Sequence, residues 1–408
     1  MKQFLQIALG ILSAIGGFVD IGDLVFNTQA GATFGFELMW VVVIGVIGII
    51  VYSEMCGRVA AISGRPVFDL VRERVGFGAG LGTLIASEIV NLLTCAAEVG
   101  GVAIVLQLLS GLPYRLLILL AVLGLLVVSW SLPFEWLERL FGYVGLCLLV
   151  LVVAAIKTHP SWSHVAHGFV PGMPSGNRLV YLYFVVGLLG AALTPYEVYF
   201  YSSGAVEDGW SVKDLRMNKV TSVIGYGLGA LLSFALMVLA AKVFLPRGIS
   251  PEFLGTPALG VEAVLGKVGL ILALVGILFA VGGAAIETSF SGAYNLSQFF
   301  GWQWGKRERP ARAPRFALSW IVIFALAGAI VMTGYDPVKI TEYSVIFSVV
   351  ALPLTFLPIL LVANDPVYMG RHRNGRFSNV VGIAYFVLIL AIAVSAIPLM
   401  ILSNGGQG

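Results

Sequence analysis

Apolar runs separated by short polar connections extend along the whole chain. Eight runs contain no Asp, Glu, Lys or Arg: residues 116–134, 140–156, 179–196, 220–241, 268–286, 316–335, 343–363 and 377–408. Each run approaches the roughly 20 residues that an α-helix needs to cross a bilayer. The pattern therefore predicts an all-α polytopic membrane protein.

Three further apolar stretches carry one or two acids and bring the number of predicted spans to eleven. The expected ranges are about 5–34, 38–60, 78–109, 115–132, 135–157, 179–203, 217–245, 266–300, 315–334, 339–363 and 377–403. The first and the sixth contain polar residues, glycine or proline at mid-length. We expect these two helices to be broken in the middle of the membrane.

The composition agrees with this prediction. Hydrophobic residues make up 59% of the chain and charged residues only 11%, whereas soluble domains are about one quarter charged. The 408 residues leave no room for a separate soluble domain, so residues 1–408 are expected to form one transmembrane domain. The cysteines lie in apolar segments and are expected to be small hydrophobic residues rather than a disulfide framework: they are Cys56, Cys95 and Cys147.

The basic residues predict the orientation of the chain. With the N-terminus in the cytoplasm, the cytoplasmic regions hold 17 of the 24 Lys and Arg residues, as the positive-inside rule requires. The densest cluster is KRERPARAPR, residues 306–315, for which we expect contact with lipid headgroups rather than nucleic acid. An odd number of spans places the C-terminus outside. We expect an integral protein of the plasma (inner) membrane.

Six acids lie near the middle of predicted spans, and no basic residue does. These acids are Asp20, Asp23, Glu88, Glu98, Glu197 and Glu287. Ionisable groups inside a membrane are costly and are functional candidates by default. Without basic partners, they are either protonated or they meet a cation that binds and leaves.

The sixth span shows how a break would expose ligands. Pro195 has no N–H, so the carbonyl of Ala191 loses its helical partner. The break places that carbonyl beside Thr194 and Glu197. In the first span, Gly22 weakens the helix between Asp20 and Asp23.

The two breaks lie five spans apart, which indicates two inverted five-helix repeats. Interrupted helices at matching positions of two halves are the best sequence pointer to a transporter's central site. The repeats are expected at about 1–157 and 179–363, with an extra helix at about 377–403.

At these breaks the chain resembles the NRAMP family of divalent-metal transporters. The family's Asp-Pro-Gly-Asn motif corresponds to Asp20-Ile21-Gly22-Asp23, which is followed by Gln-Ala-Gly-Ala at 29–32 as in the family. The family's Met-Pro-His motif corresponds to Thr194-Pro195-Tyr196, with Ala191 three residues earlier. The acidic pattern of the family's third helix matches around Glu88 and Glu98. The resemblance implies a LeuT-like fold, and it implies that Asp20, Asp23, Thr194 and the Ala191 carbonyl hold the metal.

Two departures from the family motifs indicate a harder ion. Asp23 stands where the family motif has asparagine, and Thr194 stands where it has methionine. The implied ligands are therefore all oxygen atoms. Carboxylate and hydroxyl oxygens suit hard ions such as magnesium, which keeps several bound waters. The pattern is similar to the prokaryotic NRAMP-related magnesium transporters. Glu197, Glu287 and Tyr196 are further candidates for contact with the ion or its water.

The resemblance also predicts transport without proton coupling. Tyr196 stands where the family has a histidine. Cys95 stands where the family has an acid of the proton pathway in its third helix, so Glu98 is the acid of this pathway that remains. We therefore predict magnesium uptake by alternating access. The alternatives are a proton-coupled manganese transporter, a sodium-coupled organic-solute carrier, an intramembrane aspartyl protease and a metal-sensing receptor. We expect no enzyme activity, no cofactor, and no obligate protein partner; the partners are the transported ion and the lipid bilayer.

Overall fold

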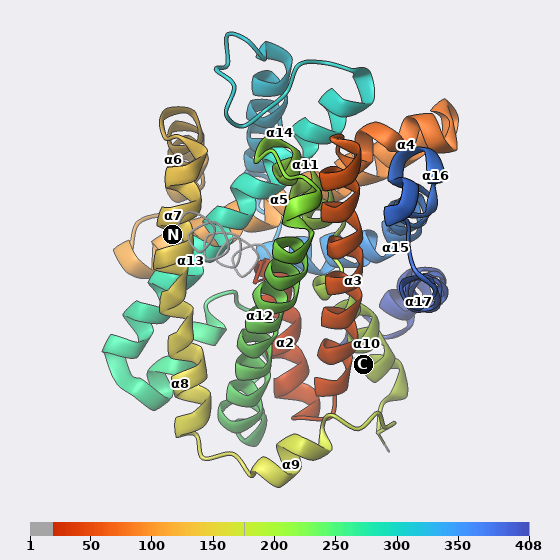
Figure 1. Ribbon diagram of the computed structural model, residues 1–408. Coiled ribbons are helices and arrows are strands. Elements are labelled where there is room, and N and C mark those ends of the chain that lie inside the picture. Colours follow the sequence, from red (N-terminus) through yellow and green to blue (C-terminus); the bar gives the residue numbers. More distant parts are fainter. Residues whose placement is uncertain (1–18, 175, 408) are drawn as a thin grey trace.

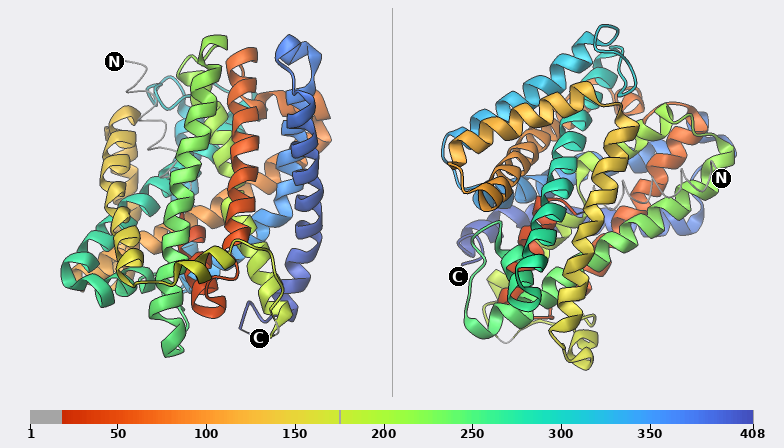
Figure 2. Two further views of the ribbon diagram at one scale, coloured as in Figure 1. Left: turned by 60° about the horizontal axis from the view of Figure 1, so that its bottom comes forward. Right: turned by 90° about the vertical axis from the view of Figure 1, so that its left-hand side faces the viewer.

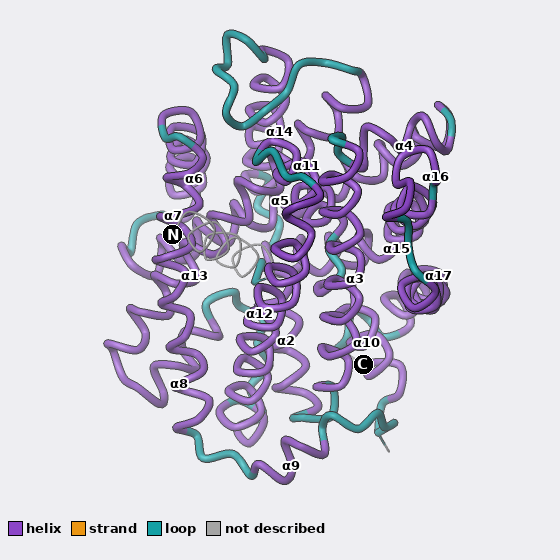
Figure 3. Tube along the Cα trace, in the orientation of Figure 1, coloured by secondary structure: helices purple, strands orange, loops and turns teal. Residues whose placement is uncertain are grey.

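The computed structural model describes residues 19–174 and 176–407, and the regular elements in these ranges are all helices (Figure 1 and Figure 3). Ten segments in these ranges are long and apolar enough to cross a membrane. They match, in order, the second to the eleventh predicted spans. They are α3 (Met39–Ser63), α5 (Phe77–Ser110), α6 (Tyr114–Ser131), α7 (Phe134–Gly145) with η1 (Leu146–Leu148) and α8 (Leu149–Lys157), α10 (Arg178–Ala192) with α11 (Pro195–Glu207), α12 (Leu215–Val243), α13 (Thr256–Phe300), α14 (Pro314–Met332), α15 (Pro337–Asn364) and α17 (Arg376–Leu402).

The first predicted span is described only in its second half. Helix α2 covers Ile21–Phe34 and begins directly after Asp20. The part of the prediction before residue 19 lies outside the described residues, so the count of eleven spans stays a prediction.

Two predicted spans differ from the observed helices. The fifth is divided, since the 3-10 turn η1 separates α7 from α8. The eighth was expected to begin at 266, but α13 begins at Thr256. Gly266 explains the difference because its φ of 70° and ψ of −165° interrupt the helix at that residue. Glycine adopts such a positive φ without the strain that a Cβ would cause.

Short elements connect the spans at the two ends of the molecule. They are α4 (Val67–Val75), α9 (Trp162–His167), η2 (Val212–Asp214), η3 (Leu245–Arg247), α16 (Pro366–Met369) and η4 (Gly370–His372). In Figure 1, α4 and α16 lie near the top, while α9 lies at the bottom. The predicted spans place the connections that contain α4 and α16 on one side of the membrane and the connection that contains α9 on the other, in agreement with these positions. We refer to the two ends as the α4 end and the α9 end.

The broken helices lie inside the bundle. Helix α2 packs against α12 and α10, and α11 packs against α3 and α13 (Figure 2). Helices α6 and α17 lie at the outside and expose large apolar side chains, for example Leu123 and Val394. Such outward apolar faces are suited to contact with lipid.

Candidate functional site

Asp20 caps the first described helix with its side chain. Its backbone is extended (φ −87°, ψ −175°), and its Oδ1 accepts a 2.9 Å hydrogen bond from the N–H of Asp23. This is the usual role of an aspartate at a helix N-cap. Its other oxygen, Oδ2, accepts a 3.3 Å hydrogen bond from the hydroxyl of Tyr196. The Asp20 carboxylate therefore joins the start of α2 to α11.

Asp23 lies one turn further along α2 and is held by neutral donors. The Ser233 hydroxyl on α12 lies 2.9 Å from its Oδ1 and 2.8 Å from its Oδ2. The amide of Asn27 donates to Oδ1 at 2.6 Å. Within the described ranges, neither Asp20 nor Asp23 forms an ion pair. The buried carboxylates are thus free of any competing fixed cation.

The second break lies where Pro195 predicts it. Helix α10 ends at Ala192 and α11 begins at Pro195, while Thr194 is extended (φ −68°, ψ 124°). Since Pro195 has no N–H, the Ala191 carbonyl lacks its usual i+4 donor. The Thr194 hydroxyl donates to Oε2 of Glu197 at 3.0 Å. Hydroxyl, carbonyl and carboxylate oxygens therefore gather at this break.

The start of α2 is in contact with the break between α10 and α11. A Cβ added to Gly22 would lie 3.1 Å from Oδ1 of Asp20 and 3.7 Å from Cβ of Ala191. The start of α2 therefore lies beside the end of α10, and the closest approach to the added Cβ is by Val345 of α15, at 2.8 Å. The structure brings together the predicted residues Asp20, Gly22, Ala191 and Tyr196.

Helices α5 and α13 complete the surroundings of Tyr196. Ser291 donates to the Tyr196 carbonyl at 3.0 Å, and Thr288 donates to Oε1 of Glu98 at 3.3 Å. Oε2 of Glu98 has no hydrogen-bond partner among the described residues. Cys95 lies next to Glu98 on α5, and its Sγ is 3.9 Å from the Ala285 carbonyl. Asp20, Glu98, Glu197 and Glu287 all lie close enough to Tyr196 to act on it electrostatically.

The acids do not converge on one point. Among residues 19–174 and 176–407, no three His, Cys, Asp or Glu side chains are placed to hold one metal ion. Glu88 also lies apart, with its Oε2 beside Gly292 on α13. The metal-ligand set therefore remains a prediction from the motifs.

Several polar residues of the site were not foreseen. Asn27 follows Asp23 by four residues, and this i,i+4 spacing on a helix would have indicated it. Ser233, Thr288 and Ser291 are single hydroxyls in apolar spans. No local pattern distinguishes them, because their role depends on which helices pack together.

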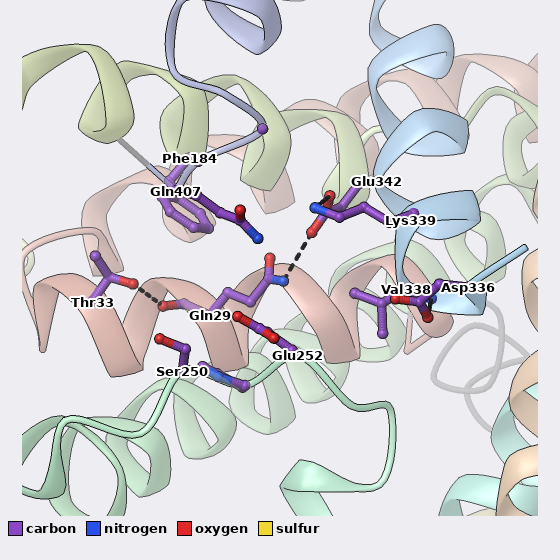
Figure 4. A pocket seen from close by; sticks show the side chains of 13 residues that line it. Gln29, Thr33, Phe184, Ser250, Glu252, Asp336, Val338, Lys339, Glu342 and Gln407 are labelled. Atoms are coloured by element: carbon purple, nitrogen blue, oxygen red, sulfur yellow. Dashed lines mark hydrogen bonds and ion pairs between the residues drawn. The ribbon is translucent and has the colours of Figure 1, made fainter.

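A pocket of about 410 Å³ lies beyond the site, toward the end of the molecule that carries α9. Figure 4 shows Gln29 of α2 pointing toward Glu342 of α15. The Gln29 amide donates to Oε1 of Glu342 at 3.0 Å, and Nζ of Lys339 lies 2.8 Å from Oε2. Glu252 and Asp336 also line this pocket, which makes its wall rich in acids.

Comparison with known proteins covers nearly the whole chain. A family model described as natural resistance-associated macrophage protein-like (Nramp) matches residues 10–398. The divalent metal cation transporter MntH of Deinococcus radiodurans is 25% identical over 394 residues, which are 92% of this chain and 85% of that protein. MntH of Burkholderia ambifaria is 27% identical over 371 residues, which are 87% of this chain and 80% of that protein.

Solved structures show the same fold. A manganese transporter of Eremococcus coleocola, in complex with an aromatic bis-isothiourea substituted compound, superposes with a TM-score of 0.79 at 20% identity. The match covers 97% of this chain and 86% of that one. Mhp1, a nucleobase-cation-symport-1 family transporter, superposes with a TM-score of 0.60 at 18% identity, over 96% of this chain and 91% of that one. The LeuT-like fold that the resemblance implies is confirmed.

Proposed function

The chain belongs to the natural resistance-associated macrophage protein-like (Nramp) family, and we propose that it transports divalent metal cations through the two helix breaks. The related MntH proteins are divalent metal cation transporters. The described residues contain ten segments long and apolar enough to cross a membrane, as expected of an integral membrane protein. Asp20 lies at the start of α2, which touches the break that carries the Ala191 carbonyl deep in the bundle. A cation at this point would meet negative groups and no fixed positive charge.

The transported ion is magnesium. The feature that supports this proposal is the oxygen-only set of donors that the motif resemblance implies: Asp20, Asp23, the Ala191 carbonyl and Thr194. Oxygen ligands favour hard ions, whereas a methionine sulfur would favour softer transition metals. Thr194 is shorter than methionine and leaves room for water, which magnesium releases reluctantly.

Transport proceeds without proton coupling. Tyr196 occupies the position at which the family motif has a histidine, and its hydroxyl donates a hydrogen bond to Asp20. A phenol does not exchange protons readily near neutral pH, whereas an imidazole does. Membrane potential supplies the drive instead, since moving a double charge inward gains about 4.6 kcal/mol per 100 mV, twice the value for one charge.

Alternating access would open and close the contacts of the broken helices. Asp20 joins α2 to α11, and Asp23 joins α2 to α12. A bound cation would share the carboxylate oxygens that accept these neutral hydrogen bonds. Binding therefore changes the links between the elements that we expect to move. The predicted orientation, with the N-terminus in the cytoplasm, makes the acidic pocket at the α9 end the outer entrance.

Reconstituted liposomes test this function. Magnesium and manganese influx are followed with fluorescent reporters, and a pH dye reports proton movement. Magnesium influx without acidification, lost in Asp20→Ala and Asp23→Ala, is the expected result. Glu37→Gln is the matched control, because Glu37 is an exposed acid in the loop after α2.

A second candidate is proton-coupled manganese transport. Glu98 favours it, because this buried carboxylate has one oxygen without a partner and lies near Asp20. Manganese influx with internal acidification and no magnesium signal would establish this candidate in place of the first.

A further inference from the structure

A second large pocket lies at the α4 end of the molecule, away from both helix breaks. It encloses about 630 Å³. Its walls come from the end of α6, from residues 305–313 of the loop between α13 and α14, and from the first turns of α14. Segments more than 170 residues apart in the chain therefore form one cavity.

One end of this pocket is basic. Lys306, Arg307 and Arg309 line it together with one acid, Glu308. Arg307 forms an ion pair with Asp208, with 2.7 Å between Nη2 and Oδ1. Arg309 is exposed, and its side chain has no hydrogen bond or ion pair within the described ranges. At least one guanidinium is therefore available for an anionic group.

The other end is apolar and aromatic. Trp130 and Trp320 lie with their ring centroids 6.2 Å apart, and Phe290 packs on Trp320 at 5.5 Å. Trp130 is 56% exposed, whereas Trp320 is buried. Tryptophan side chains concentrate at the boundary between headgroups and acyl chains. The pocket thus passes from a charged surface to an apolar wall in the way that a lipid molecule does.

The basic wall is held in place by the protein. Oε1 of Glu207, at the end of α11, accepts 2.8 Å hydrogen bonds from the Lys306 N–H and from the Tyr294 hydroxyl. Nη1 of Arg307 donates to the Glu207 carbonyl at 3.0 Å. The loop is therefore anchored to α11 and α13, and a ligand would find it already formed, which reduces the entropic cost of binding.

We propose that this pocket binds an anionic phospholipid of the leaflet at the α4 end. Its phosphate group lies at Arg309, next to Lys306, and its acyl chain lies against Trp130 and Phe316. Basic pockets between transmembrane helices are suited to such headgroups. A free phosphate would leave the aromatic wall uncovered, and a zwitterionic lipid would bring its own cation to the basic end.

Lipid retention by the full-length protein tests the proposal. Delipidated protein in detergent is incubated with phosphatidylglycerol or phosphatidylcholine of the same acyl chains, and bound lipid is counted by native mass spectrometry. We expect phosphatidylglycerol to bind about fivefold more tightly, which corresponds to one cation–headgroup contact. Arg309→Gln should remove this preference. Arg216→Gln, an exposed arginine on α12 outside the pocket, should keep it.

Two further arms identify the ligand. Trp130→Ala should weaken the retention of both lipids, because it removes part of the acyl-chain wall while leaving the charges. Inorganic phosphate should not displace the bound lipid. Equal retention of the two lipids, an Arg309→Gln variant that behaves like Arg216→Gln, or displacement by inorganic phosphate would each overturn the proposal.

Discussion

The Ser233 hydroxyl on α12 lies within 2.9 Å of both carboxylate oxygens of Asp23 at the start of α2. It is a neutral donor that comes from 210 residues further along the chain. Asp20 is held in the same manner by Tyr196. A cation that arrives at these carboxylates therefore meets neutral hydroxyl donors, which orient the carboxylates, and does not have to expel a lysine or arginine. This arrangement fits a site that must bind an ion and then release it.

Ser233→Ala should weaken ion binding without removing a carboxylate. The hydroxyl orients Asp23 and stabilises its charged form, and a hydrogen bond to a charged group contributes about 1.5–3 kcal/mol. We expect the magnesium concentration for half-maximal influx to rise roughly tenfold. Ser395→Ala is the control, since Ser395 donates within its own helix α17. An unchanged half-maximal concentration would show that Ser233 only fills space.

Tyr196→Phe should leave transport uncoupled. The change removes the hydroxyl that donates to Asp20 but adds no group that titrates near neutral pH. We expect magnesium influx to fall by about threefold or less, because the 3.3 Å hydrogen bond is longer than a strong O–H···O bond, and we expect no signal from the internal pH dye. Tyr196→His is the variant to compare with it in the pH-dye measurement, because an imidazole at this position could carry protons. Acidification driven by magnesium in the unmodified protein would contradict the uncoupled mechanism.

The sequence could predict features that depend on a single residue's backbone chemistry. Pro195 was sufficient to locate the break between α10 and α11, because a missing N–H has the same effect in any helix. Helix α4 (Val67–Val75) is not among the predicted elements. It contains Asp69, Arg72 and Arg74 and is too short and too polar to match the pattern of a membrane-spanning helix.

Features that depend on the packing of distant segments could not be predicted. The bond between Ser233 and Asp23 requires α12 to lie against α2, and no pattern around Ser233 indicates this. The predicted eighth span begins at 266, ten residues after the start of α13, and the helix is interrupted at Gly266 by a backbone conformation that the sequence does not reveal. The motif resemblance implies a ligand set, which stays a prediction, and the packing of the helices places neutral donors at Asp20 and Asp23.

Thr194→Met should shift the ion preference toward softer metals. A thioether at this position would replace an oxygen donor and occupy the space that we assign to water. We expect the ratio of manganese to magnesium influx to increase on the order of tenfold. Thr333→Met, at an exposed threonine after α14, is the matched control. If the ratio stays the same in both variants, Thr194 does not face the ion.

Gly31→Ala should destabilise the protein because α2 and α12 approach closely at Gly31. An added Cβ would lie 2.9 Å from Cα of Met237 and from Cβ of Ala240. Overpacking of this kind costs about 1–3 kcal/mol. The apparent melting temperature in detergent should therefore decrease. Gly124→Ala on α6 should leave it unchanged or raise it, since nothing lies within 4 Å of that position. Equal shifts in both variants would argue against a tight helix crossing.

Gln29→Ala should loosen the contact between α2 and α15 at the α9 end. The Gln29 amide joins α2 to Glu342 of α15, and its loss leaves Glu342 still paired with Lys339. No buried charge is left alone, so the variant should fold. One neutral hydrogen bond contributes about 0.5–1.5 kcal/mol, and we expect a reporter cysteine, Thr33→Cys, to react about threefold faster with a membrane-impermeant thiol reagent. Cys147→Ala removes the half-buried background thiol. Gln107→Ala, at the end of α5, is the control, and equal reaction rates in the two variants would show that the Gln29–Glu342 contact does not restrain α2 at this end.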